Sequence, residues 1–385
     1  MPIISIDELK LAVIKGDVGA ISIDTSTVEK YQYGFETGLL AKMSQFSRLD
    51  TDHLVLDIIL HEMKSHLLGQ ADLIKTQVQN SLKPLGNSWG IEKERRDEVL
   101  KSLFGEQTVN ERTEKRLQDF LYNTSATILE CADLVDLQQV LSRYTETKPP
   151  FGNKEAKKNE FPDAIALLAL EGWAAKNKKV IAVSNDGDWK RFCADSDLIY
   201  FVDNLAHALS VFQGDADDAA KLFRAALDAG KLDDLDEYLL DAINSQSDKI
   251  RVDFEAAASW YYESELVQVT VSANEPLIEQ VKGFEVVEYA NNTLVIQTTL
   301  TVDVTPQFVV SFDLWDYVDR EYVGMGSTTV EATEEMDLNL VITTIFEDGQ
   351  ITIDSAELLP EGIVMDFGEI EPDWMGDSSE EDETR

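Results

Sequence analysis

Hydrophobic and polar positions divide the chain into two parts with different periodicities. Up to about residue 212, short β-branched runs alternate with stretches in which apolar residues recur at helical spacing. From about residue 250 to 360, apolar and polar residues alternate one by one, which is typical of strands with a single buried face. The change of period predicts two folding units of different class.

The first part alternates predicted strands with predicted helices. Strands are expected at 18–26, 53–59, 125–131, 179–184 and 198–202, with the start of the following helix as the alternative for 53–59. Helices are expected at 136–146, from 162 to about 177 and around 204–212, and a charge-rich helical insertion at about 70–120. This order predicts a mainly parallel sheet with helices on both faces. Functional sites in such sheets lie beyond the carboxyl ends of the strands.

The second part is expected to hold three segments. Residues 213–249 are predicted to be a helical linker, and residues 250–370 an acidic antiparallel domain resembling a sandwich or barrel. Residues 371–385 carry a run of like charges and are predicted to be a disordered tail. The predicted fold class is therefore α/β, followed by an acidic helical segment and an antiparallel β domain.

Composition narrows the class of protein. A chain of 385 residues with 44% hydrophobic residues can form two or three domains with sizeable cores. It has no apolar run of about 18 residues, which excludes a membrane-spanning helix, and its first residues do not form a secretory signal. Cys131 and Cys193 lack metal-like spacing and are expected to be buried thiols in a reducing compartment. We therefore expect a soluble, cytoplasmic protein.

The net charge of −40 is unevenly distributed. Residues 1–215 carry 25 Lys and Arg against 33 Asp and Glu, whereas residues 216–385 carry 8 against 40. The first part is thus near balance at −8, and the second part holds the remaining −32. Strong acidity argues against a nucleic-acid partner only for the second part. The first part has basic clusters at 93–96, 152–158 and 176–179.

Acidic residues stand where the predicted elements bring side chains to the carboxyl edge of the sheet. They are Asp24, Glu62, Asp163, Asp186 and Asp188. Each alone has an ordinary explanation, such as a helix cap, a favourable charge at a helix start or an Asx turn. Together they would repel one another unless a cation neutralised them, and carboxylate oxygens are the ligands that Mg²⁺ and Mn²⁺ prefer. The pattern predicts a site for one or two such ions, which could drive phosphodiester hydrolysis.

Other chemistries fit the sequence less well. The four histidines, His53, His61, His66 and His207, show no zinc-like i, i+4 spacing, and no GxSxG, GxxxxGK[ST] or GxGxxG motif is present. A phosphatase of the aspartate-nucleophile type would need an acid two positions after Asp24, where Ser26 stands.

The order of these acids resembles the PIN domain family of metal-dependent nucleases. The resemblance rests on Asp24-Thr25-Ser26, on Glu62 in LHEMKSHL, on Asp163 in EFPDAIALL and on SNDGDW at 184–189, and it covers about residues 18–212. The last two motifs are the more specific, and the stretch from 144 to 189 is similar to one bacterial PIN-like group. The resemblance implies a three-layer α/β/α fold and activity mostly on RNA, with some relatives acting on DNA. It does not explain the helical insertion or the acidic C-terminal extension.

We interpret the sequence as a metal-dependent endonuclease, with RNA favoured over DNA. Asp24, Glu62, Asp163 and Asp186 are the predicted catalytic ligands of Mg²⁺ or Mn²⁺. Asp188 is expected to be either a fifth ligand, bound directly or through water, or the residue that orients the turn. The side chains expected to hold these carboxylates are Thr25, Ser26, Ser184 and Asn185. Phosphate contacts are expected from Lys154, Lys157, Lys158 and Arg191, although a solvated loop explains the lysines equally well. The alternative is a catalytically silent scaffold that binds a protein partner through its acidic half. Homodimers are common among PIN relatives, and nothing in the sequence marks a dimer surface.

Overall fold

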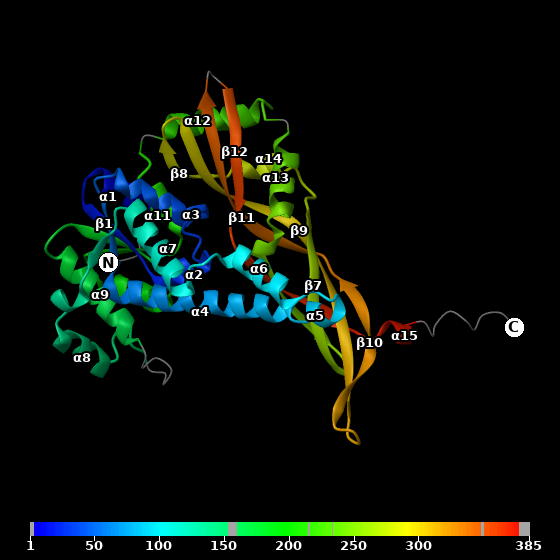
Figure 1. Ribbon diagram of the computed structural model, residues 1–385. Coiled ribbons are helices and arrows are strands. Elements are labelled where there is room, and N and C mark those ends of the chain that lie inside the picture. The colour runs from blue at the N-terminus through cyan, green and yellow to red at the C-terminus, as the bar shows by residue number, and fades with distance from the viewer. Residues whose placement is uncertain (1–3, 153–159, 215, 233, 348–349, 377–385) are drawn as a thin grey trace. The chain divides into compact units, whose positions relative to one another are not determined.

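The computed structural model describes residues 4–152, 160–214, 216–232, 234–347 and 350–376 (Figure 1). The chain forms two compact units, Met1–Gly214 and Asp215–Arg385. The first unit contains the acids that the sequence singles out.

The first unit is built on a five-stranded sheet whose strands are all parallel. Its strand order is β3-β2-β1-β4-β5. The bounds are β1 Val18–Ile23, β2 Asp52–Leu56, β3 Thr127–Leu129, β4 Lys179–Val183 and β5 Ile199–Val202. The central strands β1 and β4 are buried almost throughout, as continuous apolar runs in parallel sheets require. Residues 53–56 are strand, and a helix begins at Asp57, so both interpretations of 53–59 hold in part.

Helices cover both faces of this sheet, which confirms the predicted three-layer architecture. Helices α9 and α11 both pack against β4 and β5, α4 contacts α9, and α3 contacts α11. The bounds are α1 Ile6–Ile14, α2 Thr25–Lys30, α3 Gly38–Lys42, α4 Asp57–Leu82, α8 Leu137–Thr145, α9 Phe161–Ala174, α10 Gly187–Asp195 and α11 Leu205–Ser210. In the described part of the chain, no helix is long and apolar enough to cross a membrane.

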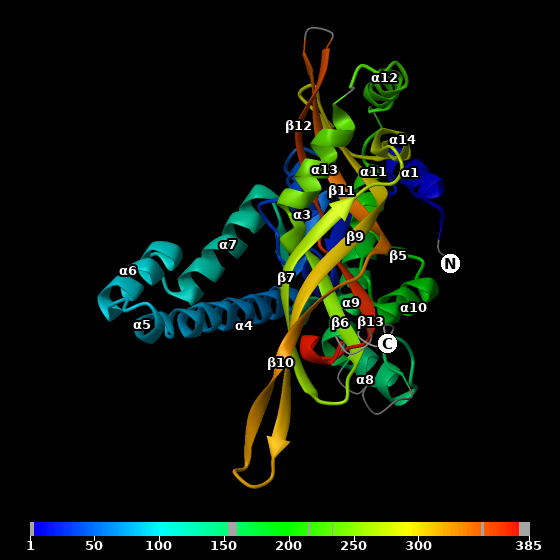
Figure 2. The same cartoon turned by 90° about the vertical axis from the view of Figure 1, so that its right-hand side faces the viewer.

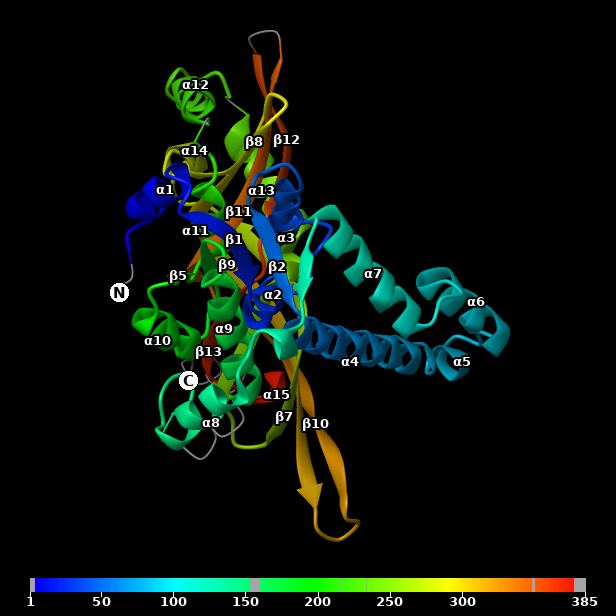
Figure 3. The ribbon, with the colours of Figure 1, turned by 90° about the vertical axis from the view of Figure 1, so that its left-hand side faces the viewer.

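The helical insertion forms an arm that extends away from the sheet (Figures 2 and 3). It consists of the distal part of α4 with α5 Leu85–Ser88, α6 Lys93–Phe104 and α7 Val109–Asn123. Only the base of the arm is buried, at residues such as Leu67, Leu117 and Phe120. Arg116 of α7 fixes the base, because its guanidinium donates to both carboxylate oxygens of Glu36 at 2.7 Å.

The second unit is organised around one 24-residue strand, β9 Thr293–Asp316. Strands β7 Tyr261–Ser272 and β8 Glu285–Ala290 pair with one edge of β9. Strands β10 Glu321–Glu331 and β11 Glu334–Glu347 pair with the other edge, and β12 Gln350–Leu358 continues from β11. All these pairs are antiparallel, as predicted, and every second residue of β9 from 294 to 312 is buried.

The segment expected to be a linker belongs to the core of the second unit. Its helices are α12 Asp217–Asp228 and α13 Leu235–Ser245, and α14 Leu277–Val281 lies nearby. Phe223, Leu239 and Ile243 are fully buried in one cluster with Leu294 and Ile342 of the sheet. Helices whose apolar faces fill a domain core are part of that domain.

One strand pair differs from the predicted antiparallel pattern. Strands β6 Ile250–Ala257 and β13 Glu361–Glu369 pair in parallel as a separate two-stranded sheet. They contribute Phe254 and Phe367 to a smaller core with Phe308 and Phe312 of β9. Within the stretch expected to be a disordered tail, Asp373–Gly376 forms the short helix α15, and residues 377–385 lie outside the described part.

Candidate metal centre

The predicted acids gather beyond the carboxyl ends of β1 and β4. These strands are neighbours at the centre of the sheet, with Ile23 paired to Val183. The chain runs from β1 to β2 on one side and reaches β4 on the other, so this is the switch point of the sheet order. Asp24 directly follows β1, and Ser184 directly follows β4.

Asp24 is a buried carboxylate held by hydroxyl groups from both strand ends. Its side chain accepts hydrogen bonds from Ser26 Oγ at 2.6 Å and Ser184 Oγ at 2.8 Å, and from the Thr25 N–H at 2.7 Å. Burial raises the pKa of Asp24 to about 6, the two serines oppose this, and the negative charge of Asp163 raises the pKa further. The two carboxylates are therefore close enough to interact electrostatically.

Glu62 is connected to the same site through Thr25. The Thr25 hydroxyl donates to Glu62 Oε2 at 2.8 Å, which links α4 to the first turn of α2. Thr25 is buried and Glu62 is half-buried. The hydrogen bond therefore fixes the glutamate while leaving part of its carboxylate accessible.

The tightest acidic group combines two predicted residues with one that the sequence interpretation missed. Glu160, Asp163 and Asp186 each place a carboxylate oxygen within 4.8 Å of the others, and all three are half-buried. Asp163 accepts a hydrogen bond from the indole N–H of the fully buried Trp189 at 2.8 Å. Among the described residues, Asp24, Glu62 and Asp188 are not members of this group.

Local sequence explains how these three acids come together. Glu160 is the N-cap of α9 but does not cap it with its side chain, and Asp163 follows three residues later on the same helix surface. Asp186 is the N-cap of α10, and its Oδ1 accepts from the Asp188 N–H at 2.6 Å. The i, i+3 spacing of Glu160 and Asp163 was the signal in the sequence that could have identified Glu160.

The remaining residues predicted to bind metal or substrate do not join the acidic group in the described part of the chain. Asp188 is 3% exposed and forms an ion pair with Arg191 on the same helix, so its carboxylate is directed into the protein and Arg191 is engaged with it. Asn185 is exposed, and its backbone N–H, rather than its side chain, donates to Ser26 Oγ. Lys154, Lys157 and Lys158 lie outside the described residues.

The donor atoms at this site suit a hard divalent cation. They are all carboxylate oxygens, the type of ligand that Mg²⁺ and Mn²⁺ favour over nitrogen or sulfur. Three carboxylates within 4.8 Å repel one another, and a bound cation would remove that repulsion. The residues present therefore fit such an ion.

A comparison with family models identifies the domain. Residues 21–189 match the model of the PIN domain. This part of the chain is a PIN domain. The match runs from β1 to Trp189 and includes every acid described above. PIN domains are generally nucleases that use divalent metal ions. No curated protein and no solved structure shows significant similarity to the chain.

A groove in the PIN domain begins beside the acids. It has a volume of about 920 Å³ and lies between α4 and the segments that contain α8 and the start of α9. Its walls are mainly apolar, and the polar side chains along the α4 wall are Asp57, His61, Glu62, Ser65 and His66. Glu62 lines the groove and is also connected to the acidic site, so an extended ligand bound in the groove would run past the carboxylates.

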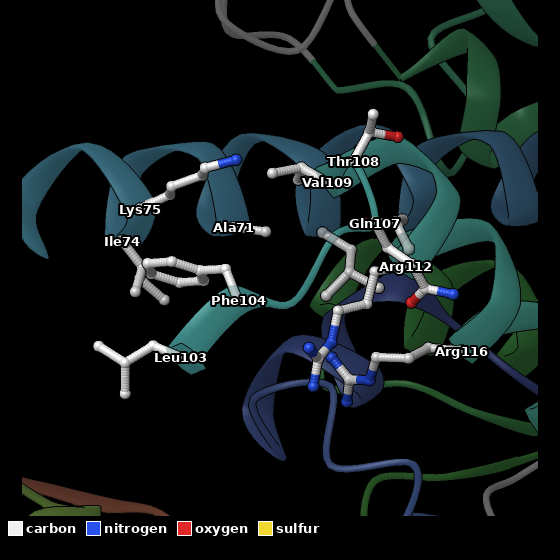
Figure 4. A pocket seen from close by; sticks show the side chains of 12 residues that line it. Ala71, Ile74, Lys75, Leu103, Phe104, Gln107, Thr108, Val109, Arg112 and Arg116 are labelled. Atoms are coloured by element: carbon white, nitrogen blue, oxygen red, sulfur yellow. The ribbon is translucent and has the colours of Figure 1, made fainter. Parts of the chain in front are cut away.

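A smaller pocket of about 260 Å³ lies at the arm between α4, α6 and α7 (Figure 4). Leu67, Ala71 and Ile74 line it from α4, on the face opposite to the one that bears Glu62. The side chains of Arg112 and Arg116 lie close together at one end of the pocket. Its lining contains no carboxylate, so it is separate from the candidate metal centre.

Proposed function

We propose that the PIN domain is a metal-dependent endonuclease that cleaves RNA in preference to DNA, with Mg²⁺ or Mn²⁺ as the cofactor. The observation that carries the proposal is the convergence of Glu160, Asp163 and Asp186 within 4.8 Å, beside the buried Asp24. The preference for RNA is supported by the resemblance to a family that acts mostly on RNA.

Glu160, Asp163 and Asp186 would hold the metal, with Asp24 and Glu62 completing the acidic site. A bound divalent ion supplies Lewis-acid activation of the attacking water and stabilises the charge on the leaving oxygen. The chain's own contribution is to fix the carboxylates. Ser26 and Ser184 orient Asp24, Thr25 orients Glu62, and the Trp189 indole orients Asp163.

The groove beside α4 supplies a path for the substrate strand. His61 and Ser65 offer hydrogen-bond donors along it, and apolar side chains such as Val135 and Ile165 form the opposite wall. Apolar walls suit unstacked bases better than a duplex, whose outer surface is formed by phosphates. The proposed substrate is accordingly single-stranded at the site of cleavage.

The test compares purified full-length protein with two variants of equal charge change. Asp186→Asn removes a proposed ligand, whereas Asp203→Asn alters an acid that follows β5 at the same sheet edge but is not a member of the acidic group. Total RNA and single-stranded DNA are incubated with Mn²⁺, Mg²⁺ or a chelator.

We expect metal-dependent RNA cleavage by the wild type and by Asp203→Asn, and none by Asp186→Asn. Cleavage that persists in the chelator or in Asp186→Asn contradicts the proposal. Binding of Mn²⁺ without cleavage of either nucleic acid would favour the silent scaffold instead.

A further inference from the structure

Aromatic side chains are exposed together at one end of the second unit. We define the aromatic patch as Tyr261 of β7, Trp315 of β9, Tyr322 of β10 and Tyr317 in the turn between β9 and β10. Tyr261 is 53% exposed, Tyr322 55%, Trp315 37% and Tyr317 85%. Exposed apolar groups gathered in this way mark interaction sites more often than scattered ones do.

The patch lies on the face of the sheet opposite to its core. Tyr262 and Phe312 are paired neighbours on adjacent strands and point into the smaller core, where Phe312 is 1% exposed. Because side chains alternate between faces, Tyr261 and Asp313, one position along, point the other way. Packing within the unit therefore does not explain why large rings occupy these positions.

The rings of Tyr261, Trp315 and Tyr322 contact one another across three strands. Trp315 and Tyr322 are directly paired between β9 and β10, with ring centroids 5.0 Å apart. The Tyr261 and Tyr322 rings are 5.3 Å apart. Contacts of this kind restrict the side chains before any partner arrives, which lowers the entropic cost of binding.

Negative charge surrounds these rings. Glu263 and Asp313 point to the same face as the patch, and the Glu263 carboxylate raises the pKa of the Tyr261 hydroxyl. Asp316 and Glu321, which are paired across β9 and β10, lie one position from the Trp315–Tyr322 pair and therefore point to the opposite face. Residues 306–331 contain five acids and a single basic residue, Arg320. A cation bound over the rings would be attracted by Glu263 and Asp313, which lie on the same face.

We propose that the aromatic patch is a docking site for an Arg- or Lys-rich segment of a protein partner. Cationic side chains bind over the faces of tryptophan and tyrosine and pair with neighbouring carboxylates, so both features of the surface favour the same ligand. A nucleic acid would be repelled by the acids around the rings. A second copy of the chain would bring an equally acidic surface and would also be repelled. This proposal is independent of the nuclease activity.

The experiment measures binding of fluorescent octa-arginine to the full-length chain at physiological ionic strength, by fluorescence anisotropy. Octa-glutamate serves as the peptide control. The test variant combines Trp315→Ser with Tyr322→Ser, which removes rings without changing charge. The matched control is Tyr238→Ser on α13, another exposed tyrosine of the same acidic unit, at 39% exposure.

We expect the double variant to weaken octa-arginine binding about tenfold, as loss of two cation–π contacts implies, and the Tyr238 variant to bind as the wild type does. Circular dichroism and melting curves establish that the variants are folded. Equal binding by the wild type and both variants would show general attraction to an acidic protein and overturn the proposal. A self-associating wild type that the double variant makes monomeric, with peptide binding unchanged, would overturn it in favour of a contact between copies.

Discussion

Substitution of Asp163 by asparagine separates two explanations of an acid at the start of a helix. If Asp163 only favours the helix dipole, its neutralisation costs about 0.3–1 kcal/mol of stability. If it belongs to the metal centre, it is also repelled by Glu160 and Asp186, whose carboxylate oxygens lie within 4.8 Å. The two explanations predict opposite signs for the change in stability of the metal-free protein.

The magnitude follows from Coulomb's law. Two unit charges 4.8 Å apart repel by about 0.9 kcal/mol in bulk water and by about 3.5 kcal/mol at an effective dielectric constant of 20. We use the bulk-water value as a lower bound for each of the two pairs that Asp163 makes, because half-burial can only strengthen the repulsion. After subtraction of the helix-dipole contribution, Asp163→Asn should stabilise the metal-free domain by about 1 kcal/mol. Asparagine retains an oxygen that can accept the Trp189 hydrogen bond.

Scanning calorimetry of the full chain in chelator and in Mn²⁺ tests this prediction. In chelator, the melting temperature of the affected transition should rise by about 2–4 °C. The wild type should gain about 2.7 kcal/mol at a Mn²⁺ concentration 100-fold above its dissociation constant, and the variant should lose most of that gain. The control is Asp7→Asn, an exposed first-turn acid of α1, which should be slightly destabilised and respond to Mn²⁺ as the wild type does. If Asp163→Asn behaves like this control, Asp163 is only a helix-start residue and the proposed centre is wrong.

Three further predictions concern the same unit. Glu160→Gln should weaken Mn²⁺ binding about tenfold or more in isothermal titration calorimetry, as expected for loss of a ligand, and an unchanged affinity would remove Glu160 from the site. Because the pKa of Asp24 is about 6, its negative charge beside the three proposed ligands is lost as the pH is lowered through 6, and Mn²⁺ affinity should fall in the same range. Ser184→Ala removes a hydrogen bond that lowers this pKa, so the fall should move to higher pH, and a fall at the same pH in both proteins would contradict the assignment. Burial lowers the pKa of His53 to about 3 from 6.5, so the folded unit binds fewer protons than the unfolded chain between these values. Its stability is therefore complete above pH 6.5 and should fall by several kcal/mol as the pH drops toward 3, at about 1.4 kcal/mol for each pH unit. His53→Asn should show a smaller difference between its urea midpoints at pH 7 and pH 4, and equal pH sensitivity would refute this role.

Local patterns predicted much of the fold because they report local physics. The buried runs at 18–23 and 179–183 are strands, and one-by-one alternation along 294–312 marks the two faces of β9. The acids that follow β1 and β4 could be placed at one edge because parallel strands end at the same edge of a sheet. The resemblance to the PIN domain family, carried by the motifs around these acids, is confirmed by the family match over residues 21–189.

Features that depend on distant contacts were not predictable in this way. The parallel pair of β6 and β13 joins Ile250 to Glu361, and nothing local to either strand specifies the other. The apolar side of α12 indicated burial, but not that Phe223 would pack against strands far along the chain. Glu160 was missed because its role depends on Asp186, which arrives from another helix. Asp188 looked like a ligand, and only the fold shows that it is paired with Arg191.

The long strand β9 has a consequence for the local unfolding of the second unit. On one edge of β9, residues up to Val304 pair with β11 and residues from Gln307 pair with β10. Pro306, which lies at this change, lacks the N–H group that a continuous ladder of hydrogen bonds needs. The Thr305 and Thr333 hydroxyls bridge this break at 2.8 Å. The larger core lies on one side of it and the smaller core on the other. We therefore expect the second unit to contain two regions that each unfold cooperatively. Amide hydrogen exchange should be slower in residues 293–304 than in residues 307–316. A protein partner bound to the aromatic patch would slow amide exchange in residues 307–316 and leave exchange in residues 293–304 unchanged.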